Sequence, residues 1–382
     1  MDFRFTDEQE MMRRMARDFA DNEIAPYAGQ WDKNDEFPYD VVKKMHELGL
    51  MTIGVPAEYG GAGLDHVAQN LVVEEIARGD AGLCTTMAAS TLLGPDPVLI
   101  AATDEQKKWW YDRELDGNLT AFCLTEPGAG SDVAGLTTRC QKVGDEYILN
   151  GTKQFISNGG VAGLYTVFAT MDRKLGHKGM CCFMVDRNTP GITIGPKEDK
   201  LGIRSSNTTS VIFEDVKVPA KNLLGNEGDG FRIAMKTLDI SRASVAAMAI
   251  GVAQAAYEAS AKYSFERTQF GKPIFAFQAI QFILADMAQY IEAGRLLYLM
   301  ASSKQNMGLA YTEAASLAKC FCGDVAMKVA TDAVQVYGGY GYTKEYPVEK
   351  YFRDAKIMQI FEGTAQVQRL VIAGDIAKQF KP

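Results

Sequence analysis

Residues 164–170 read LYTVFAT and residues 180–185 read MCCFMV, two short runs that are rich in apolar and β-branched side chains. Four more segments between residues 120 and 218 have the same character, namely TAFCLT, EYILNG, GITIG and SVIFEDVKV. Glycine, asparagine or proline bounds these segments, which is typical of antiparallel strands in a barrel or sandwich. Because strands and helices do not alternate here, a Rossmann-type nucleotide site is not expected.

Helical patterns lie on both sides of this β region. Thr6-Asp7-Glu8-Gln9 and Thr103-Asp104-Glu105-Gln106 are capping boxes, each followed by apolar residues at helical spacing. Long helices are predicted from Gly230 to about residue 335, with breaks at Gly271-Lys272-Pro273 and near Gly308.

The predicted fold class is therefore α+β, with the β-structure in the middle of the chain. We expect an N-terminal α-helical domain at residues 1–117, a central antiparallel β-domain at 118–226 and a C-terminal α-helical domain at 227–382.

Composition limits the possible partners and compartments. Of the 382 residues 47% are hydrophobic and 23% charged, which is ordinary for a soluble globular protein of two or three domains. The formal charge of −8 argues against nucleic acids and anionic membrane surfaces as partners. We expect no membrane-spanning segment. Asp7, Glu8 and Arg13 interrupt the N-terminal stretch where a signal peptide would be apolar, so we expect a cytoplasmic protein.

Cysteine and histidine residues give no sign of a metal site. The chain has seven cysteines without zinc-type spacing, and we expect all of them to be reduced thiols. Cys181-Cys182 lies inside an apolar run and is predicted to be strand core. The three histidines, His46, His66 and His177, are far apart in the sequence.

Glu362 is the strongest candidate for an acid–base residue. It lies among apolar and small residues in Ile360-Phe361-Glu362-Gly363, where loss of water would raise its pKa toward neutrality. The alternative is a Glu at a helix end, next to a cap formed by Thr364, and these residues alone favour that alternative.

Four further clusters combine glycines with polar or aromatic residues. They are Thr125–Asp132 (TEPGAGSD), Phe155–Gly160 (FISNGG), Arg267–Lys272 (RTQFGK) and Gln335–Tyr342 (QVYGGYGY). Glycines let a backbone approach a ligand closely, hydroxyls can donate hydrogen bonds to it, and an arginine suits phosphate binding. The first cluster is also compatible with an ordinary turn, and the third with a helix C-terminus that carries a cation.

Five motifs appear in one order: TEPGAGSD, ERTQFGKP, QVYGGYGY, YPVEKYFRDAK and FEGTAQVQR. With them the sequence resembles the acyl-CoA dehydrogenase family, FAD-dependent flavoproteins that desaturate acyl-CoA thioesters. The resemblance covers nearly the whole chain. It implies an α/β/α order with a C-terminal four-helix bundle, assembly into a homotetramer and electron-transfer flavoprotein as the electron acceptor.

The resemblance also assigns roles to single residues. Those implied around the flavin ring are Phe122, Leu124, Thr125, Phe155 and Ser157. Those implied for the pyrophosphate and adenosine part are Arg267, Gln269 and Phe270, with Gln335 and Gly339 from a neighbouring subunit, and Thr364 and Gln366 complete the cofactor site. Ser131 and Arg242 are implied to meet the CoA moiety.

The implied reaction is α,β-dehydrogenation, in which Glu362 removes the α-proton while the β-hydride passes to flavin N5. The Glu362 N–H and a ribityl hydroxyl bind the thioester carbonyl. Phe361 seals the pocket, and Gly363 permits close approach of the thioester. Some relatives carry the base at the position of Ser241, which is not an acid, so the base is expected at Glu362.

The acyl group is expected to be short-chain, branched or alicyclic. No Arg occurs between Ala81 and Ile100, so a dicarboxylyl substrate is not expected. Asp96, between Pro95 and Pro97, is either a solvated helix end or a carboxyl that faces the acyl pocket. The second possibility makes a cyclic acyl group a candidate.

Two other functions are compatible with the same motifs. One is an acyl-CoA oxidase that uses O2, but the ordinary dehydrogenase length favours the dehydrogenase. The other is a non-catalytic acyl-CoA-binding homologue, against which Glu362, Arg267 and Gln335 argue.

Overall fold

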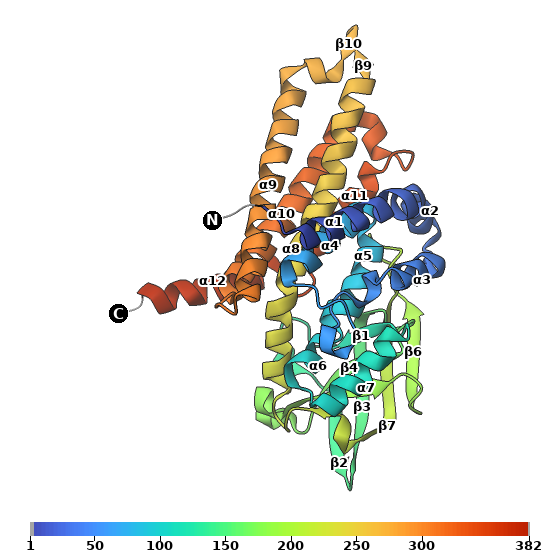
Figure 1. Cartoon of the computed structure of the whole chain (residues 1–382), viewed down its shortest axis with the longest axis vertical. Coiled ribbons are helices and arrows are strands. Elements are labelled where there is room, and N and C mark those ends of the chain that lie inside the picture. The colour runs from blue at the N-terminus through green and yellow to red at the C-terminus, as the bar shows by residue number, and fades with distance from the viewer. Residues whose placement is uncertain (1–3, 381–382) are drawn as a thin grey trace.

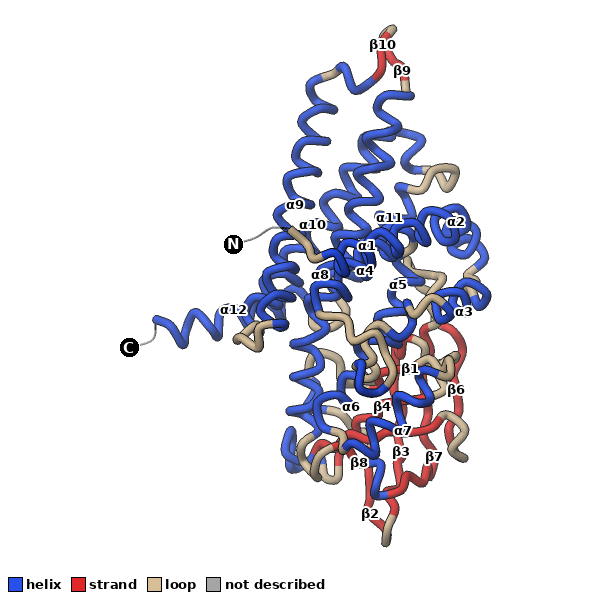
Figure 2. Tube along the Cα trace, viewed as in Figure 1, coloured by secondary structure: helices blue, strands red, loops and turns tan. Residues whose placement is uncertain are grey.

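The structure, a computed structural model, describes residues 4–380. Helices come first along the chain, then a β-sheet, then helices again (Figure 1). Figure 2 shows the strands gathered at one end of the molecule, apart from a small hairpin at the opposite end. The predicted α+β class and the order of its three parts are confirmed.

The first part is helical. Its α-helices are α1 (Asp7–Phe19), α2 (Ala25–Asn34), α3 (Tyr39–Glu47), α4 (His66–Gly79), α5 (Ala81–Ala88), α6 (Asp96–Ala101) and α7 (Asp104–Leu115). Both predicted capping boxes are present. The Gln9 N–H donates to Thr6 Oγ1 at 3.2 Å, and the Gln106 N–H donates to Thr103 Oγ1 at 3.3 Å.

The middle part is an eight-stranded sheet. Its strands are β1 (Thr120–Cys123), β2 (Arg139–Val143), β3 (Glu146–Ser157), β4 (Leu164–Thr170), β5 (Met180–Asp186), β6 (Ile192–Lys197), β7 (Thr208–Pro219) and β8 (Leu223–Leu224). The order is β6-β7-β3-β2-β4-β5-β8, and β1 pairs with β4. Most pairs are antiparallel as predicted, but β4 runs parallel to β1, with Phe122 opposite Thr166, and to β2, with Arg139 opposite Thr170. The short segments rich in apolar and β-branched residues therefore form one sheet.

The last part is helical again, with a small hairpin between its first two helices. Its elements are α8 (Gly230–Glu266), β9 (Thr268–Gln269), β10 (Lys272–Pro273), α9 (Gln278–Asn306), α10 (Thr312–Tyr337), α11 (Val348–Ala355) and α12 (Ala365–Phe380). The predicted breaks at Gly271-Lys272-Pro273 and near Gly308 are confirmed. The hairpin lies at the far end of α8 from the sheet, and α12 projects from the body (Figure 1).

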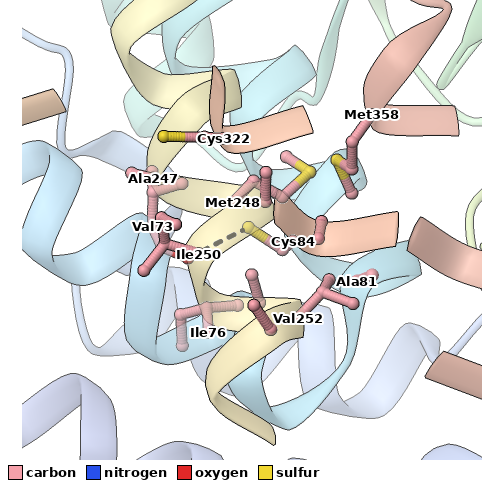
Figure 3. Packing of buried hydrophobic residues seen from close by; sticks show 14 of the residues in the cluster. Val73, Ile76, Ala81, Cys84, Ala247, Met248, Ile250, Val252, Cys322 and Met358 are labelled. Atoms are coloured by element: carbon pink, nitrogen blue, oxygen red, sulfur yellow. Dashed lines mark hydrogen bonds between the residues drawn. The ribbon is translucent and has the colours of Figure 1, made fainter. Parts of the chain in front are cut away.

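The largest core lies where α4, α5, α8 and α10 meet (Figure 3). Val73, Ile250 and Cys322 pack there, and the Cys84 thiol donates to the Val73 carbonyl at 3.3 Å. Gly251 permits the close approach of α4 to α8, because a Cβ at that position would lie 2.3 Å from the Glu74 carbonyl oxygen. All seven cysteines are free thiols, as expected, and all of them are buried.

A buried ion cluster joins the three parts of the chain. Lys350 donates to Asp80 of the first part at 2.6 Å and to Asp354 at 2.5 Å. Asp80 also accepts from Ser205, and Asp354 accepts from the Ile203 N–H at 2.6 Å. Because each carboxylate binds a cation and another donor, the charges are satisfied away from water.

Among the described residues, one helical segment, Ala81–Ala101, is long and apolar enough to cross a membrane. This differs from the expectation that no such segment exists. In the structure, 83% of the most apolar part of this segment is buried among other residues, so the segment belongs to the protein core.

Candidate active site

Glu362 lies in a tight turn between α11 and α12. Its φ angle is 51° and that of Gly363 is 93°, both in the left-handed region. Non-glycine residues adopt this conformation mostly where the surrounding structure imposes it, often at functional sites. Thr364 Oγ1 accepts from the Val367 N–H at 3.2 Å and so caps α12. The cap therefore belongs to Thr364, while the Glu362 side chain contacts α8.

The half-buried Glu362 carboxylate is subject to opposing effects on its pKa. Ser241 Oγ of α8 donates to Glu362 Oε2 at 2.5 Å. Burial raises the pKa of Glu362, whereas this hydrogen bond and the charges of Lys319 and Arg242 lower it, and the result is a pKa of about 7. A carboxylate with this pKa can accept a proton at neutral pH.

The carbonyl on the other side of this turn is fixed by two donors. Lys319 Nζ donates to the Gly363 carbonyl at 2.5 Å, and Gln368 Nε2 donates to it at 3.1 Å. Lys319 is 1% exposed, and burial lowers its pKa to about 8 although Glu362 acts in the opposite direction. Within the described chain the Glu362 N–H has no acceptor. One residue therefore presents both a base and an unpaired backbone donor.

The residues expected around a flavin ring lie together at one end of the sheet. The Gln154 N–H donates to the Thr125 carbonyl at 2.8 Å, which joins the end of β3 to the segment after β1. Phe155 has a φ of 56° and its side chain is 64% exposed. The hydroxyls of Thr125 and Ser157 bind no group of the described chain. Phe122 and Leu124 belong to the same short segment.

A buried ion pair lies beneath this end of the sheet. Lys153 Nζ donates to Glu126 Oε1 at 2.7 Å and to the Leu124 carbonyl at 3.1 Å, and Lys153 is fully buried. Burial alone would raise the pKa of Glu126, but Lys153 and the donors of Thr137 and Thr138 lower it to about 2. The ionised pair fixes the backbone of the TEPGAGSD loop.

The residues expected at the pyrophosphate lie at the opposite end of the molecule. Arg267, Gln269 and Gly339 line one groove of about 520 Å³. The Arg267 guanidinium lies 5.3 Å from the ring centre of Tyr340. Phe270 has a φ of 51° and is 91% exposed. Gln335 is exposed near the end of α10, outside the residues that line the groove.

The two halves of the expected cofactor site are far apart in one chain. Figure 1 shows the sheet and the β9–β10 hairpin at opposite ends of the molecule. The sequence placed these residues in one site but did not reveal this separation.

The remaining expected residues are found in different surroundings. Arg242 is buried, pairs with Asp239 and keeps an unpaired Nε, while burial lowers its pKa. Phe361 packs against the helical core. Ser131 is exposed on the loop after β1, and Gln366 is exposed on α12.

Asp96 is buried, with 6% of its surface exposed. The interpretation as a solvated helix end is therefore wrong. Pro95 and Pro97 do place it at the start of α6, but α6 packs on α8, and the packing removes water from the carboxyl.

Comparison with known proteins places the whole chain in one family. Three family models match: Acyl-CoA dehydrogenase, N-terminal domain at residues 6–118, middle domain at 121–216 and C-terminal domain at 228–377. The chain belongs to the acyl-CoA dehydrogenase family. It is an acyl-CoA dehydrogenase, a flavin-dependent oxidoreductase.

Individual relatives are similar over at least 90% of their length. An acyl-CoA dehydrogenase of Bacillus subtilis is 50% identical over 96% of this chain and 97% of its own. The mitochondrial short-chain specific acyl-CoA dehydrogenase of Bos taurus is 44% identical over 97% of this chain and 90% of its own.

Solved structures of similar proteins superpose closely on this chain. Butyryl-CoA dehydrogenase from Megasphaera elsdenii has a TM-score of 0.96 at 45% identity, covering 98% of this acyl-CoA dehydrogenase and all of that chain. A chain from a study of the electron transferring flavoprotein of Acidaminococcus fermentans has a TM-score of 0.97 at 46% identity, with 100% coverage of both chains.

FAD is the cofactor of this acyl-CoA dehydrogenase. Two features of the chain fit it. The exposed Phe155 ring and the free hydroxyls of Thr125 and Ser157 suit a planar ring with polar edges. The groove beside Arg267 offers a cation and glycines that leave room for a phosphate.

Three residues of the acyl-CoA dehydrogenase that hold backbone carbonyls of the site in place were not predicted from the sequence: Lys319, Gln368 and Lys153. Strand alternation gave a signal for Lys153, because Tyr147, Leu149 and Lys153 share the inward face of β3. Lys319 stands on the apolar face of α10 with Ala315 and Ala318, which is a weaker signal.

Proposed function

We propose that the enzyme dehydrogenates a short acyl-CoA thioester to the enoyl-CoA, with Glu362 as the catalytic base. The observation that carries this proposal is the combination found at Glu362, whose pKa is about 7 and whose backbone N–H is unpaired. A base near neutral pKa can take the α-proton, and the N–H can bind the thioester carbonyl.

Each neighbouring residue has a role in this proposal. Polarisation of the carbonyl by the Glu362 N–H makes the α-C–H more acidic, and Glu362 Oε2 then accepts the proton. Ser241 holds the carboxylate in place, Phe361 excludes water and Gly363 lets the thioester approach. FAD, when bound, supplies the acceptor for the β-hydride.

The cofactor site is proposed to be shared between subunits. Its flavin-ring part comprises Phe122, Leu124, Thr125, Phe155 and Ser157, and its pyrophosphate and adenosine part comprises Arg267, Gln269, Phe270, Gln335 and Gly339, with Thr364 and Gln366. The flavin-ring part lies in the sheet region and the groove beside Arg267 lies near the β9–β10 hairpin at the opposite end of the molecule (Figure 1), which supports contributions from two chains. We propose a homotetramer accordingly.

Ser131 and Arg242 are proposed to meet the CoA moiety. The unpaired Nε of the buried Arg242 and the exposed Ser131 hydroxyl support this assignment. The domain division at 117/118 and 226/227 remains part of the proposal, since β1 and α8 begin just after these positions.

The proposed acyl group is short-chain, branched or alicyclic, and the proposed electron acceptor is electron-transfer flavoprotein. The similarity to short-chain and butyryl-CoA relatives supports the first, and the similarity to the Acidaminococcus fermentans chain supports the second. We propose the cytoplasm as the compartment.

The test is anaerobic addition of acyl-CoA thioesters to the purified FAD-loaded protein while flavin absorbance is recorded. Straight short, branched, long and alicyclic acyl groups form the panel. We expect bleaching by at least one short, branched or alicyclic thioester, and by none in Glu362→Gln.

Each rival function has its own signature in this experiment. Oxygen consumption at the rate of substrate turnover would indicate an oxidase, whereas bleaching that persists until electron-transfer flavoprotein is added indicates the dehydrogenase. A colourless protein that cannot be reconstituted with FAD would indicate a non-catalytic homologue.

A further inference from the structure

Asp96 is a buried carboxyl with an unsatisfied oxygen. Its Oδ2 is inaccessible to solvent and has no hydrogen-bond partner in the described chain. Buried polar atoms are nearly always hydrogen-bonded, so an unpaired one in a folded enzyme needs an explanation. A bound ligand that supplies the missing partner is one such explanation.

The position of Asp96 relative to Glu362 favours the substrate as that ligand. α6, which begins at Asp96, packs on α8, and α8 carries the Ser241 hydroxyl that holds Glu362. The negative charge of Glu362 acts directly on the Asp96 carboxyl. Asp96 therefore lies beside α8, within electrostatic reach of Glu362, the base of the proposed reaction.

The other groups around Asp96 do not satisfy it. Tyr111 and Glu114 of α7 and Tyr311 before α10 are close enough to interact with it electrostatically. Glu114 Oε2 accepts from Trp110 Nε1 at 3.1 Å, while its Oε1 is unpaired as well. Two buried acids thus each keep a free oxygen, with no hydrogen bond between them.

Burial favours the protonated form of both acids. Burial raises the pKa of Asp96 well above its usual range, and the charge of Glu362 raises it further. Burial likewise raises the pKa of Glu114 well above its usual range. A protonated carboxyl is a hydrogen-bond donor, so Asp96 is suited to donate to an oxygen rather than to remove a second proton from carbon.

We propose that Asp96 is a specificity residue that donates a hydrogen bond to an oxygen atom on the acyl chain, so that the enzyme accepts thioesters bearing a hydroxyl or oxo group. This inference rests on the proposed dehydrogenation, and it adds the chemical class of the acyl group. A hydrocarbon chain alone would leave the buried carboxyl unpaired, whereas an acyl oxygen satisfies it.

The test compares matched pairs of thioesters on the FAD-loaded enzyme. The pairs are butanoyl-CoA with 4-hydroxybutanoyl-CoA, and pentanoyl-CoA with 5-hydroxypentanoyl-CoA. The measured quantity is the ratio of kcat/KM for the hydroxylated thioester to that for its parent. We expect Asp96→Leu to lower this ratio by roughly 10- to 100-fold, the loss typical of one hydrogen bond to a buried group.

Two further variants serve as controls. Asp96→Asn keeps a donor and should retain most of the ratio. Asp116→Leu makes the same change at an exposed residue after α7 and should leave both rates as in the wild type. An unchanged ratio in Asp96→Leu would overturn the proposal, as would a wild-type enzyme that bleaches with the parent thioesters but with no hydroxylated one.

Infrared difference spectroscopy on the wild type and on Asp96→Asn tests the same hydrogen bond without Asp96→Leu, in case that variant does not fold. The protonated Asp96 carboxyl should give a C=O stretching band that is absent from Asp96→Asn. This band should shift when a hydroxylated thioester binds and stay in place with its parent; no shift with either hydroxylated thioester would overturn the proposal. Failure of the underlying dehydrogenation is distinguishable, because no thioester of either kind would then bleach the wild-type flavin.

Discussion

Ser241 and Glu362 are joined by a hydrogen bond of 2.5 Å although 121 residues separate them in the sequence. The bond connects α8 to the turn before α12 and stabilises the ionised form of the carboxylate. It acts in the same direction as the charges of Lys319 and Arg242, and against burial. The pKa of about 7 is thus a balance of opposing effects, each of which can be removed separately.

Replacing Glu362 by Gln should abolish proton removal while the neutral side chain keeps the same shape. Because general-base catalysis contributes roughly 100- to 10,000-fold, we expect flavin reduction to slow by at least that range. Stopped-flow absorbance measures the rate, and flavin content checks the fold. Glu345→Gln, at an exposed residue, is the matched control and should react as the wild type.

The rate of flavin reduction should depend on pH through Glu362. The carboxylate must be ionised to accept a proton, and its pKa is about 7. We therefore expect kcat/KM to rise about tenfold per pH unit below 7 and to level off above it. A flat profile between pH 5 and 8, measured with a substrate whose own ionisation does not change, would contradict this assignment.

Ser241→Ala should move that pH profile toward higher pH. Removal of the hydroxyl takes away a hydrogen bond to the ionised form, so the pKa of Glu362 rises on the order of one unit. The rate on the high-pH plateau should change less than the rate at pH 6. Loss of activity by the same factor at every pH would instead mean that Ser241 only supports the local structure.

Lys319→Met should affect both the pKa and the position of Glu362. The change removes a nearby cation, which raises the Glu362 pKa, and it removes the donor to the Gly363 carbonyl. We expect the pH profile to shift upward and the plateau rate to fall as well. Lys328→Met, at an exposed residue of the same helix, is the control and should change neither.

Lys153→Met should destabilise the fold and weaken FAD binding. The variant leaves the buried Glu126 carboxylate without its cation, and breaking such a pair lowers the free energy of unfolding by roughly 3–5 kcal/mol. Denaturant unfolding and retention of flavin on dilution are the measurements. Lys142→Met on neighbouring β2 is the control, because Lys142 is 57% exposed in its side chain.

The pH dependence of that loss has a definite sign. The pKa of Glu126 lies near 2 in the folded protein against 4.5 as its ordinary value, so its contribution is present above pH 4.5 and is lost as pH falls toward 2. The difference in stability between wild type and Lys153→Met should therefore shrink over this range. A difference that stays constant down to pH 2 would show that Glu126 is not the group affected.

Local patterns predicted much of the fold. Capping residues at Thr6 and Thr103, and the run of apolar and β-branched residues in LYTVFAT, act over a few residues, and the structure has helices and strands there. The parallel pairing of β1 with β4 was not predicted, because it joins segments about 40 residues apart and leaves no local pattern.

The site was only partly predictable for a similar reason. Motifs identified Glu362, but the groups that set its pKa come from α8 and α10, and a lysine such as Lys319 usually marks an exposed position. Flanking prolines placed Asp96 at a helix start, yet its burial depends on how α6 packs against α8. Burial of a charged residue is decided by tertiary contacts that one sequence does not reveal.

The length of α8 has a genetic consequence when the cofactor site is shared between two chains. One subunit then lends its base to one site and its Arg267 to the next. Two inactive variants, Glu362→Gln and Arg267→Gln, co-expressed in one cell would form mixed assemblies. In a pair made of one subunit of each variant, one site contains both substitutions. The other site contains the wild-type Glu362 of one subunit and the wild-type Arg267 of its partner. Activity should thus reappear from two parents that have none, by intragenic complementation.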